Sequence, residues 1–340
     1  MSKWYLHSGE MNDTVVSTRV RLARNICGYP FPARMSAGQR REVNKLIKDA
    51  LLGSNSAVSG GFDYIEMREL SDLQALSLVE RRLISPDFAK NREGRALLLQ
   101  KDESISIMLG EEDHMRIQVM RPGMAVGEAG DWADKLDTLL DSNLKLAFHD
   151  QLGYLTQCPT NLGTGLRVSV MLHLPALEET GALSRLAAAV SKIGLTIRGA
   201  YGEGSGSEGS LYQLSNQVTL GISEEAAAEN LEKVARQIIR EELGAREQLR
   251  GVDLEDKIRR SVGILRNALK MDYAELTRLC SLARLGVAMG YLPDISLDAV
   301  GALTVETAPA TLQLEAGREL EPAERDILRA ERAREALKQA

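Results

Sequence analysis

Two stretches with alternating polar and apolar residues most constrain the fold. Residues 115–120 (MRIQVM) and 166–172 (LRVSVML) carry polar side chains at every second position of their central part. This period of two is typical of a β-strand with one face in water. The sequence predicts further strands at 96–99, 104–109, 195–198 and 211–218. An antiparallel sheet of these strands would place Arg116, Arg167 and Arg198 together on one face.

Helical periodicity surrounds these strands and dominates the last third of the chain. The pattern predicts helices over 40–52, 129–140, 182–193, 224–243, 254–268, 273–289 and 322–337. Two glycine- and serine-rich segments, 53–61 and 202–210, are predicted loops, and the second is either a substrate lid or a passive surface loop. The sequence therefore predicts an α+β domain over 1–246, with an antiparallel sheet flanked by helices, and an all-helical domain over 251–340.

The composition excludes several classes of function. Aromatic residues make up 4% of the chain, which argues against a nucleic-acid surface built on base stacking. The net charge of −6 gives no general attraction to nucleic acid or anionic lipid. Cys27, Cys158 and Cys280 are far apart and form no CxxC pair, which argues against a disulfide framework or a structural zinc site. With no signal segment or membrane-length apolar run, we expect a cytoplasmic protein without direct membrane or nucleic-acid binding.

Arginine recurs in four stretches that are distant in the sequence. They are 17–21 (STRVR), 111–116 (EEDHMR), 158–167 (CPTNLGTGLR) and 198–203 (RGAYGE). Arginine holds phosphate oxygens through its planar guanidinium, and glycines let backbone N–H groups approach an anion closely. With a glutamate nearby, this set suits phosphoryl transfer, in which charge stabilisation and positioning carry most of the catalysis.

Each stretch also has a plain structural interpretation. The STRVR segment is either extended, with Arg19 and Arg21 on one face, or the start of an amphipathic helix with Arg21 and Arg24 in solvent. His114 is a base, a core residue or a surface residue. Cys158 is a nucleophile, a substrate-positioning thiolate or a buried small residue. The acidic residues of EEDHMR have no spacing that requires a metal ion.

In this order, the four stretches resemble the motifs of the phosphagen (guanidino) kinases, which include creatine and arginine kinases. The resemblance is closest to the branch of bacterial protein-arginine kinases (McsB) and covers roughly the first 245 residues. Phosphagen kinases carry a small helical domain before the STRVR segment, which here begins at Ser17. A site without that domain would admit an arginine side chain of a protein. The resemblance thus implies a protein-arginine kinase. A kinase for free arginine or another small guanidino compound and a non-catalytic phosphoarginine-binding adaptor are the alternatives.

The resemblance implies roles for individual residues. Glu112 would orient and deprotonate the guanidinium nucleophile, with Glu111 and Cys158 near the guanidinium end of the site. The implied ATP-binding residues are Ser17, Thr18, Arg19, Val20, Arg21, Arg82, Arg116, Arg167, Val168, Ser169, Val170, Met171, Arg198, Gly199, Ala200, Tyr201, Gly202 and Glu203. Mg²⁺ would be held mainly by the nucleotide phosphates, with no dedicated metal site in the protein.

The segment 325–330 (RDILRA) matches the RDxxRA motif of the McsB branch. The match implies an allosteric phosphoarginine pocket formed by Arg325, Asp326, Arg329 and Ala330. Arg325 and Arg329 are four residues apart on a predicted helix and share a face, and the alternative is a solvated helix with ion pairs. The resemblance also implies a homodimer formed through the helical domain, an activator of the McsA type, and marking of proteins for a Clp ATPase/protease during stress.

Three positions depart from the family pattern. Gly110 stands where relatives usually have asparagine, and Gln213 stands where phosphagen kinases commonly have aspartate. Arg82 stands where relatives have a histidine that contacts the nucleotide. The change at Arg82 affects the expected adenine or ribose contacts more than the phosphate contacts.

Overall fold

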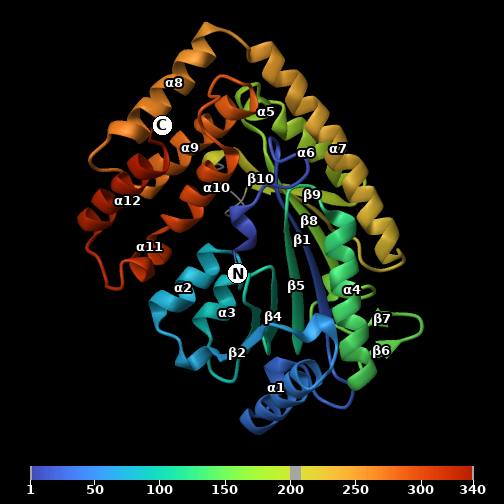
Figure 1. The fold of residues 1–340 in the computed structure, drawn as a ribbon. Helices are drawn as coiled ribbons and strands as arrows, with labels where there is room; N and C mark the ends of the chain where they lie inside the picture. Colours follow the sequence, from blue (N-terminus) through green and yellow to red (C-terminus); the bar gives the residue numbers. More distant parts are fainter. Residues whose placement is uncertain (1, 200–207, 339–340) are drawn as a thin grey trace.

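An antiparallel sheet forms the centre of the protein (Figure 1). The computed structural model describes residues 2–199 and 208–338, and among these the sheet has eight strands in the order β2-β3-β4-β5-β1-β8-β10-β9. In that order the strands are Phe62–Glu66, Ala96–Gln100, Ile105–Leu109, Met115–Pro122, Val15–Arg24, Leu166–His173, Leu211–Asn216 and Leu195–Gly199. Every neighbouring pair is antiparallel. The predicted antiparallel sheet is confirmed.

Three long helices form the main core with this sheet. α4 (Val126–Asn143) lies against β1 and β5, α7 (Glu224–Leu249) lies against β8 and β10, and α1 (Ala37–Leu52) packs on α4. The strands contribute alternate residues to this core, among them Val20 and Ile117, which are almost fully buried. Because side chains alternate along a strand, the residues between them face the other side of the sheet.

The strand register brings distant arginines together on that other face. Arg21 on β1 lies directly opposite Arg167 on β8. Arg116 lies on the same face of β5, on the other side of β1, and Arg198 lies on β9, two strands beyond β8 in matching register. The expectation that Arg116, Arg167 and Arg198 share one face is confirmed.

The position of β1 decides between the two interpretations of the STRVR segment. This segment belongs to a ten-residue strand between β5 and β8, so the amphipathic-helix alternative is wrong. Arg24, at the end of the strand, is fully buried, and its guanidinium donates to the Asp137 carboxylate at 2.7–3.0 Å. Arg24 lies on the face of β1 against which α4 packs, and β1 has a neighbouring strand on each edge, so this side chain has no position in solvent.

Shorter elements complete the first domain. They are α2 (Asp72–Glu80), α3 (Pro86–Lys90), α5 (Pro175–Glu179), α6 (Leu183–Ser191) and the hairpin of β6 (Phe148–His149) and β7 (Gly153–Tyr154). The predicted loop at 53–61 contains a 3-10 turn at Ala57–Ser59. Of the predicted loop or lid at 202–210, residues 202–207 lie outside the described residues, and Glu208–Ser210 form a 3-10 turn.

Residues 252–336 form five helices with a core of their own. They are α8 (Val252–Asn267), α9 (Tyr273–Ala288), α10 (Leu297–Glu306), α11 (Pro309–Glu315) and α12 (Pro322–Ala336). This helical unit packs against the first domain near α2 (Figure 1). The Glu80 carboxylate, at the end of α2, accepts hydrogen bonds from the backbone N–H groups of Ala310 and Thr311 and from the Thr311 hydroxyl, at 2.8–3.0 Å.

Candidate active site

A cluster of arginines on the polar face of the sheet forms the cationic part of the site. Burial, together with the guanidinium groups of Arg82, Arg116 and Arg167, lowers the pKa of Arg19 to about 10. Burial and the neighbouring Arg19, Arg116 and Arg167 also hold the pKa of Arg21 well below its usual value, and the Nε of Arg21 has no hydrogen-bond partner in the structure. Buried like charges repel one another, so the cluster is suited to a multiply charged anion such as a polyphosphate.

Gln213 is one reason why the positive charge of Arg19 is not neutralised. Its amide oxygen accepts a hydrogen bond from Nη2 of Arg19 at 2.7 Å, and Nε of Arg19 lies 3.4 Å from the Ser169 hydroxyl. Both partners are neutral. An aspartate at position 213 would offset the charge of Arg19, whereas the glutamine positions the guanidinium and leaves its full charge for an anion.

Two glutamates at the turn between β4 and β5 form the acidic part of the site. Glu111 is 6% exposed, and its carboxylate lies 2.5 Å from Nη1 of Arg116 and accepts a hydrogen bond from the Ser85 hydroxyl. Glu112 is 37% exposed, and its carboxylate lies 3.4 Å from Nη2 of Arg116. Glu111 is thus committed to fixing Arg116, while Glu112 keeps an accessible oxygen.

The surroundings of Glu112 suit it to accept a proton. Burial raises the pKa of Glu112, and the nearby Asp113 and Glu111 carboxylates raise it further. Arg116 and a hydrogen bond from the Cys158 thiol act in the opposite direction. A carboxylate with a raised pKa is a stronger base that is still ionised at neutral pH when the shift is moderate.

One cavity joins the arginine cluster to Glu112. It is lined by Arg21, Arg116, Arg167, Glu112 and Cys158, together with Asn161 from the turn after β7. The segment 158–167 reaches this cavity because its backbone passes close to β1 at Gly165. This residue has a φ of 63°, and a Cβ added there would lie 2.7 Å from the Ala23 carbonyl oxygen, so the position favours glycine. The cavity therefore offers a carboxylate at one side and guanidinium groups at the other.

The structure removes His114 as a candidate base. Nδ1 of His114 accepts a hydrogen bond from the Ile26 N–H at 2.9 Å, so the ring proton lies on Nε2, which faces the Pro30 carbonyl at 2.9 Å. Burial lowers the pKa of His114, which makes this fully buried ring a neutral core residue. Asp113 accepts hydrogen bonds from the Asn25 side chain and from the backbone N–H of Gln157, and so ties the glutamate turn to the end of β1 and to the segment before Cys158.

These hydrogen bonds could not be predicted from the sequence, because Asn25 and Asp113 are 88 positions apart.

Among residues 2–199 and 208–338, no group of three or more histidine, cysteine, aspartate or glutamate side chains is arranged to hold a metal ion. The three cysteines are free thiols, with Cys27 exposed, Cys158 partly buried and Cys280 buried.

The chain has clear relatives. It matches the family described as "ATP:guanido phosphotransferase, C-terminal catalytic domain" over residues 42–245, and the family described as "Protein-arginine kinase McsB C-terminal domain" over residues 251–340. The protein-arginine kinase of Caldanaerobacter subterraneus subsp. tengcongensis is 47% identical over 94% of this chain and 95% of its own length. That of Clostridium acetobutylicum is 45% identical over 99% of this chain and 100% of its own. The chain belongs to the protein-arginine kinase branch of the ATP:guanido phosphotransferases.

Solved structures agree with this assignment. A lombricine kinase superposes with a TM-score of 0.61 and 28% identity, over 71% of this chain and 69% of the other. The duplicated taurocyamine kinase from Schistosoma mansoni with bound transition state analog components gives a TM-score of 0.63 and 26% identity, over 75% of this chain and 39% of the other. The chain therefore shares its fold with kinases named for lombricine and taurocyamine.

Apart from Arg82, the ATP-binding residues implied by the family motifs fall into three groups in this kinase. Arg19, Arg21, Arg116, Arg167 and Arg198, with Ser17, Ser169 and Met171, lie on the polar face of the sheet. The side chains of Thr18, Val20, Val168 and Val170 face the opposite side and are buried, so they support the strands from within the core. Gly199 ends β9, and Ala200, Tyr201, Gly202 and Glu203 lie outside the described residues.

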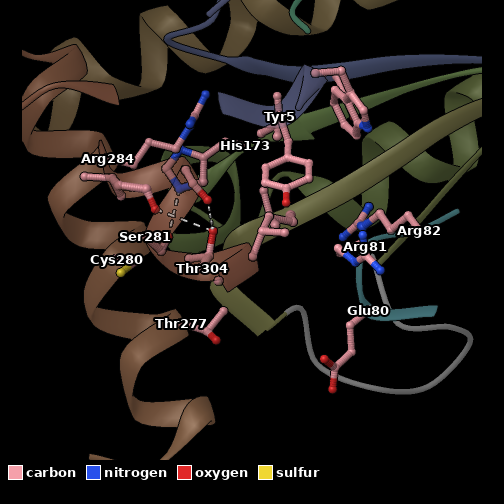
Figure 2. A pocket seen from close by; sticks show the side chains of 18 of the residues that line it. Tyr5, Glu80, Arg81, Arg82, His173, Thr277, Cys280, Ser281, Arg284 and Thr304 are labelled. Carbon is pink, nitrogen blue, oxygen red and sulfur yellow. Dashed lines mark hydrogen bonds between the residues drawn. The ribbon is translucent and has the colours of Figure 1, made fainter. Parts of the chain in front are cut away.

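Arg82 lies at a second cavity, between the sheet and the C-terminal helices. Figure 2 shows Glu80, Arg81 and Arg82 on one side of this cavity, and Ser281 of α9 with the buried His173 of β8 on the other. Arg82 has a left-handed backbone (φ 62°), and its carbonyl accepts a hydrogen bond from the Gln118 side chain at 2.9 Å. The guanidinium of Arg82 lowers the pKa of Arg19, which places it at the edge of the arginine cluster.

The RDILRA segment lies on α12, with its two arginines in different environments. Arg329 is 1% exposed, and its guanidinium donates to the carbonyls of Thr307 and Met271 at 3.1 and 3.0 Å and to the Asp326 carboxylate at 2.8 Å. Arg325 is only partly buried and donates to the Leu320 carbonyl at 3.3 Å. The core of the helical domain thus encloses Arg329, as it does Ala330, while Arg325 and Asp326 keep part of their surface exposed.

Proposed function

We propose that this chain transfers the γ-phosphate of ATP to arginine side chains of proteins. The observation that carries this proposal is the cavity in which the accessible carboxylate of Glu112 faces the guanidinium groups of Arg21, Arg116 and Arg167. A guanidinium nucleophile needs a carboxylate beside it, and a triphosphate needs several fixed cations. Membership of the protein-arginine kinase branch supports the same reaction.

In the proposed reaction, Arg19, Arg21, Arg116 and Arg167 hold the phosphates and stabilise the charge that develops during transfer. Glu112 accepts a proton from the guanidinium of the target arginine. A bond forms between that nitrogen and the γ-phosphorus, the bond from the γ-phosphorus to the bridging oxygen breaks, and ADP leaves. Mg²⁺ bound to the phosphates would supply further charge neutralisation.

A product assay tests the proposal. The protein is incubated with ATP, Mg²⁺ and a casein-like substrate, and acid-labile phosphoarginine is sought by mass spectrometry. We expect phosphoarginine on the protein substrate and at least 100-fold less with Glu112→Gln, since loss of a general base costs roughly 10²–10⁴ in rate. Glu128→Gln is the matched control, because Glu128 also pairs with an arginine, Arg121 at 2.7 Å, but lies on α4.

A parallel assay with free arginine separates the protein kinase from a kinase for small guanidino compounds. Preferential phosphorylation of free arginine would favour the small-molecule alternative. Binding of phosphoarginine without any transfer activity would favour the non-catalytic adaptor.

We also propose that the helical domain binds phosphoarginine through Arg325 and Asp326, with Arg329 as a buried support. Isothermal titration with phosphoarginine tests this, and an Arg325→Ala variant that binds as tightly as the natural protein would refute it. A homodimer, an activator of the McsA type, a Clp ATPase/protease partner, a role in stress response and a cytoplasmic location remain proposals supported by the family. Within the described residues, the helices are too short or too polar to cross a membrane.

A further inference from the structure

A strongly basic groove lies beside the catalytic cavity, outside the residues used so far. It runs between α1, the end of β2 and the segment after α3, and eight basic but only three acidic side chains line it. Those that carry the argument are Arg40, Arg41, Lys45, Lys48, Lys90 and Arg95. The chain as a whole has a net charge of −6, so this local excess of positive charge is opposite to the overall balance.

The cations of the groove differ in whether they have a partner. Arg95 pairs with Asp87 at 3.2 Å, and the Lys48 ammonium lies 4.6 Å from the centre of the Tyr64 ring. Among the described residues, Arg41, Lys45 and Lys90 form no ion pair, and all three are exposed. A solvated helix face would usually alternate its charges, whereas here unpaired cations from separate elements converge on one concavity.

The groove is continuous with the site of phosphoryl transfer. Arg40, Lys90 and Arg95 also line the neighbouring cavity that contains Glu111, Glu112 and Arg116. Nε of Arg95 donates to the Gly110 carbonyl, the residue before the two glutamates, at 3.2 Å. A polypeptide whose arginine reaches Glu112 would therefore have one flank beside the groove.

From this arrangement, and resting on the proposed kinase function, we propose that the groove binds an acidic segment next to the target arginine of the protein substrate. Arg41 to Lys48 on α1 span roughly 10 Å at 1.5 Å per residue. An extended substrate covers that length with about three residues. The substrate class is thus a polypeptide with a short run of aspartate or glutamate on one side of its arginine.

Matched peptides test this proposal. Three peptides of equal length carry one arginine, with three glutamates before it, three glutamates after it, or glutamines in both places. We expect one acidic peptide to have a kcat/KM about tenfold above that of the neutral peptide at low salt. The advantage should shrink when salt rises from about 0.05 to 0.5 M, since exposed charges are screened.

A paired variant locates the effect. Arg41→Glu with Lys45→Glu should bring the acidic-to-neutral ratio of kcat/KM to about one or below. Lys233→Glu with Arg240→Glu, a matched charge reversal at exposed positions of α7, should leave the ratio unchanged. Equal values for all three peptides, or a variant that slows all of them alike, would overturn the proposal.

A binding measurement separates this inference from the kinase function. Fluorescence anisotropy follows a labelled acidic peptide in which lysine replaces the target arginine, so no phosphoryl transfer is needed. We expect the acidic peptide to bind more tightly than the neutral one, and the Arg41→Glu, Lys45→Glu variant to lose that difference. A single-stranded oligonucleotide of equal charge that bound more tightly than the acidic peptide would assign the groove to nucleic acid and overturn the proposal.

Discussion

Two regions of this molecule bury arginine in opposite ways. In the catalytic domain, Arg19 and Arg21 are enclosed among other guanidinium groups, and Nε of Arg21 has no partner. In the helical domain, Arg329 is almost inaccessible to solvent, but carbonyls and Asp326 accept its N–H groups. Burial of an arginine therefore does not itself indicate a binding site. The decisive feature is whether the protein satisfies the side chain or leaves its charge for a ligand.

The largest expected effect comes from removing one unsatisfied arginine. Arg21→Met should lower kinase activity by roughly 10³-fold, because one charge-stabilising donor is lost from the transition state. The free energy of unfolding should stay the same or rise, since a buried like-charge repulsion disappears. Kinetics and urea denaturation of the same preparation check both parts. A variant that loses stability together with activity would place Arg21 in the same class as Arg329.

The converse substitution concerns the satisfied arginine. Arg329→Met should lower the free energy of unfolding by about 3 kcal/mol, because two buried carbonyls and a carboxylate lose their donor. Denaturant unfolding followed by circular dichroism measures the loss, with Arg332→Met, at a partly exposed position on the same helix, as control. Unchanged stability would show that the buried network contributes little.

A polyphosphate without a nucleoside tests whether the arginine cluster alone binds an anion. Tripolyphosphate at 100 times its Kd should stabilise the folded protein by about 2.7 kcal/mol, a rise in melting temperature of roughly 3–5 °C. The shift should disappear in Arg21→Met and persist in Arg332→Met. Differential scanning fluorimetry at fixed ionic strength measures it, and an equal shift in both variants would contradict an anion site at the cluster.

The smallest expected effect concerns the carboxylate side of the site. The hydrogen bond from Cys158 lowers the pKa of Glu112, so Cys158→Ala should raise that pKa further. Because the base works in its ionised form, the acidic limb of the pH–rate profile should move to higher pH. On the acidic limb, where Glu112 is partly protonated, activity should fall by up to about fivefold, in line with the loss of one hydrogen bond worth roughly 1 kcal/mol. An unshifted limb would separate Cys158 from the titration of Glu112.

The shared face of the arginines on the sheet could be predicted from the sequence. Period-two alternation places every second residue on one face, so the shared face of Arg116, Arg167 and Arg198 followed from local pattern alone. The same reasoning left open whether STRVR was extended or helical, because its central position depends on pairing with β5 and β8, and one of these lies about 150 residues away.

Local pattern failed where distant residues decide the environment. Arg24 meets Asp137 of α4, which is 113 positions along the chain, and His114 meets backbone groups of Ile26 and Pro30. Arg329 was correctly placed on a helix, but its burial depends on carbonyls from two other segments. Helical spacing predicts the face of the helix on which a side chain lies, but not which other segments pack against that face.

The hydrogen bonds of Glu80 have a consequence for the order of synthesis. They join α2 to α11 across 230 positions of the chain, and Glu80 is two residues before Arg82 at the edge of the arginine cluster. During translation, all strands of the sheet are synthesised before α11, because β10 ends at Asn216 and α11 begins at Pro309. Until then the end of α2 lacks its final anchor, so a nascent kinase would carry an incompletely fixed nucleotide site and mature only with its last helices.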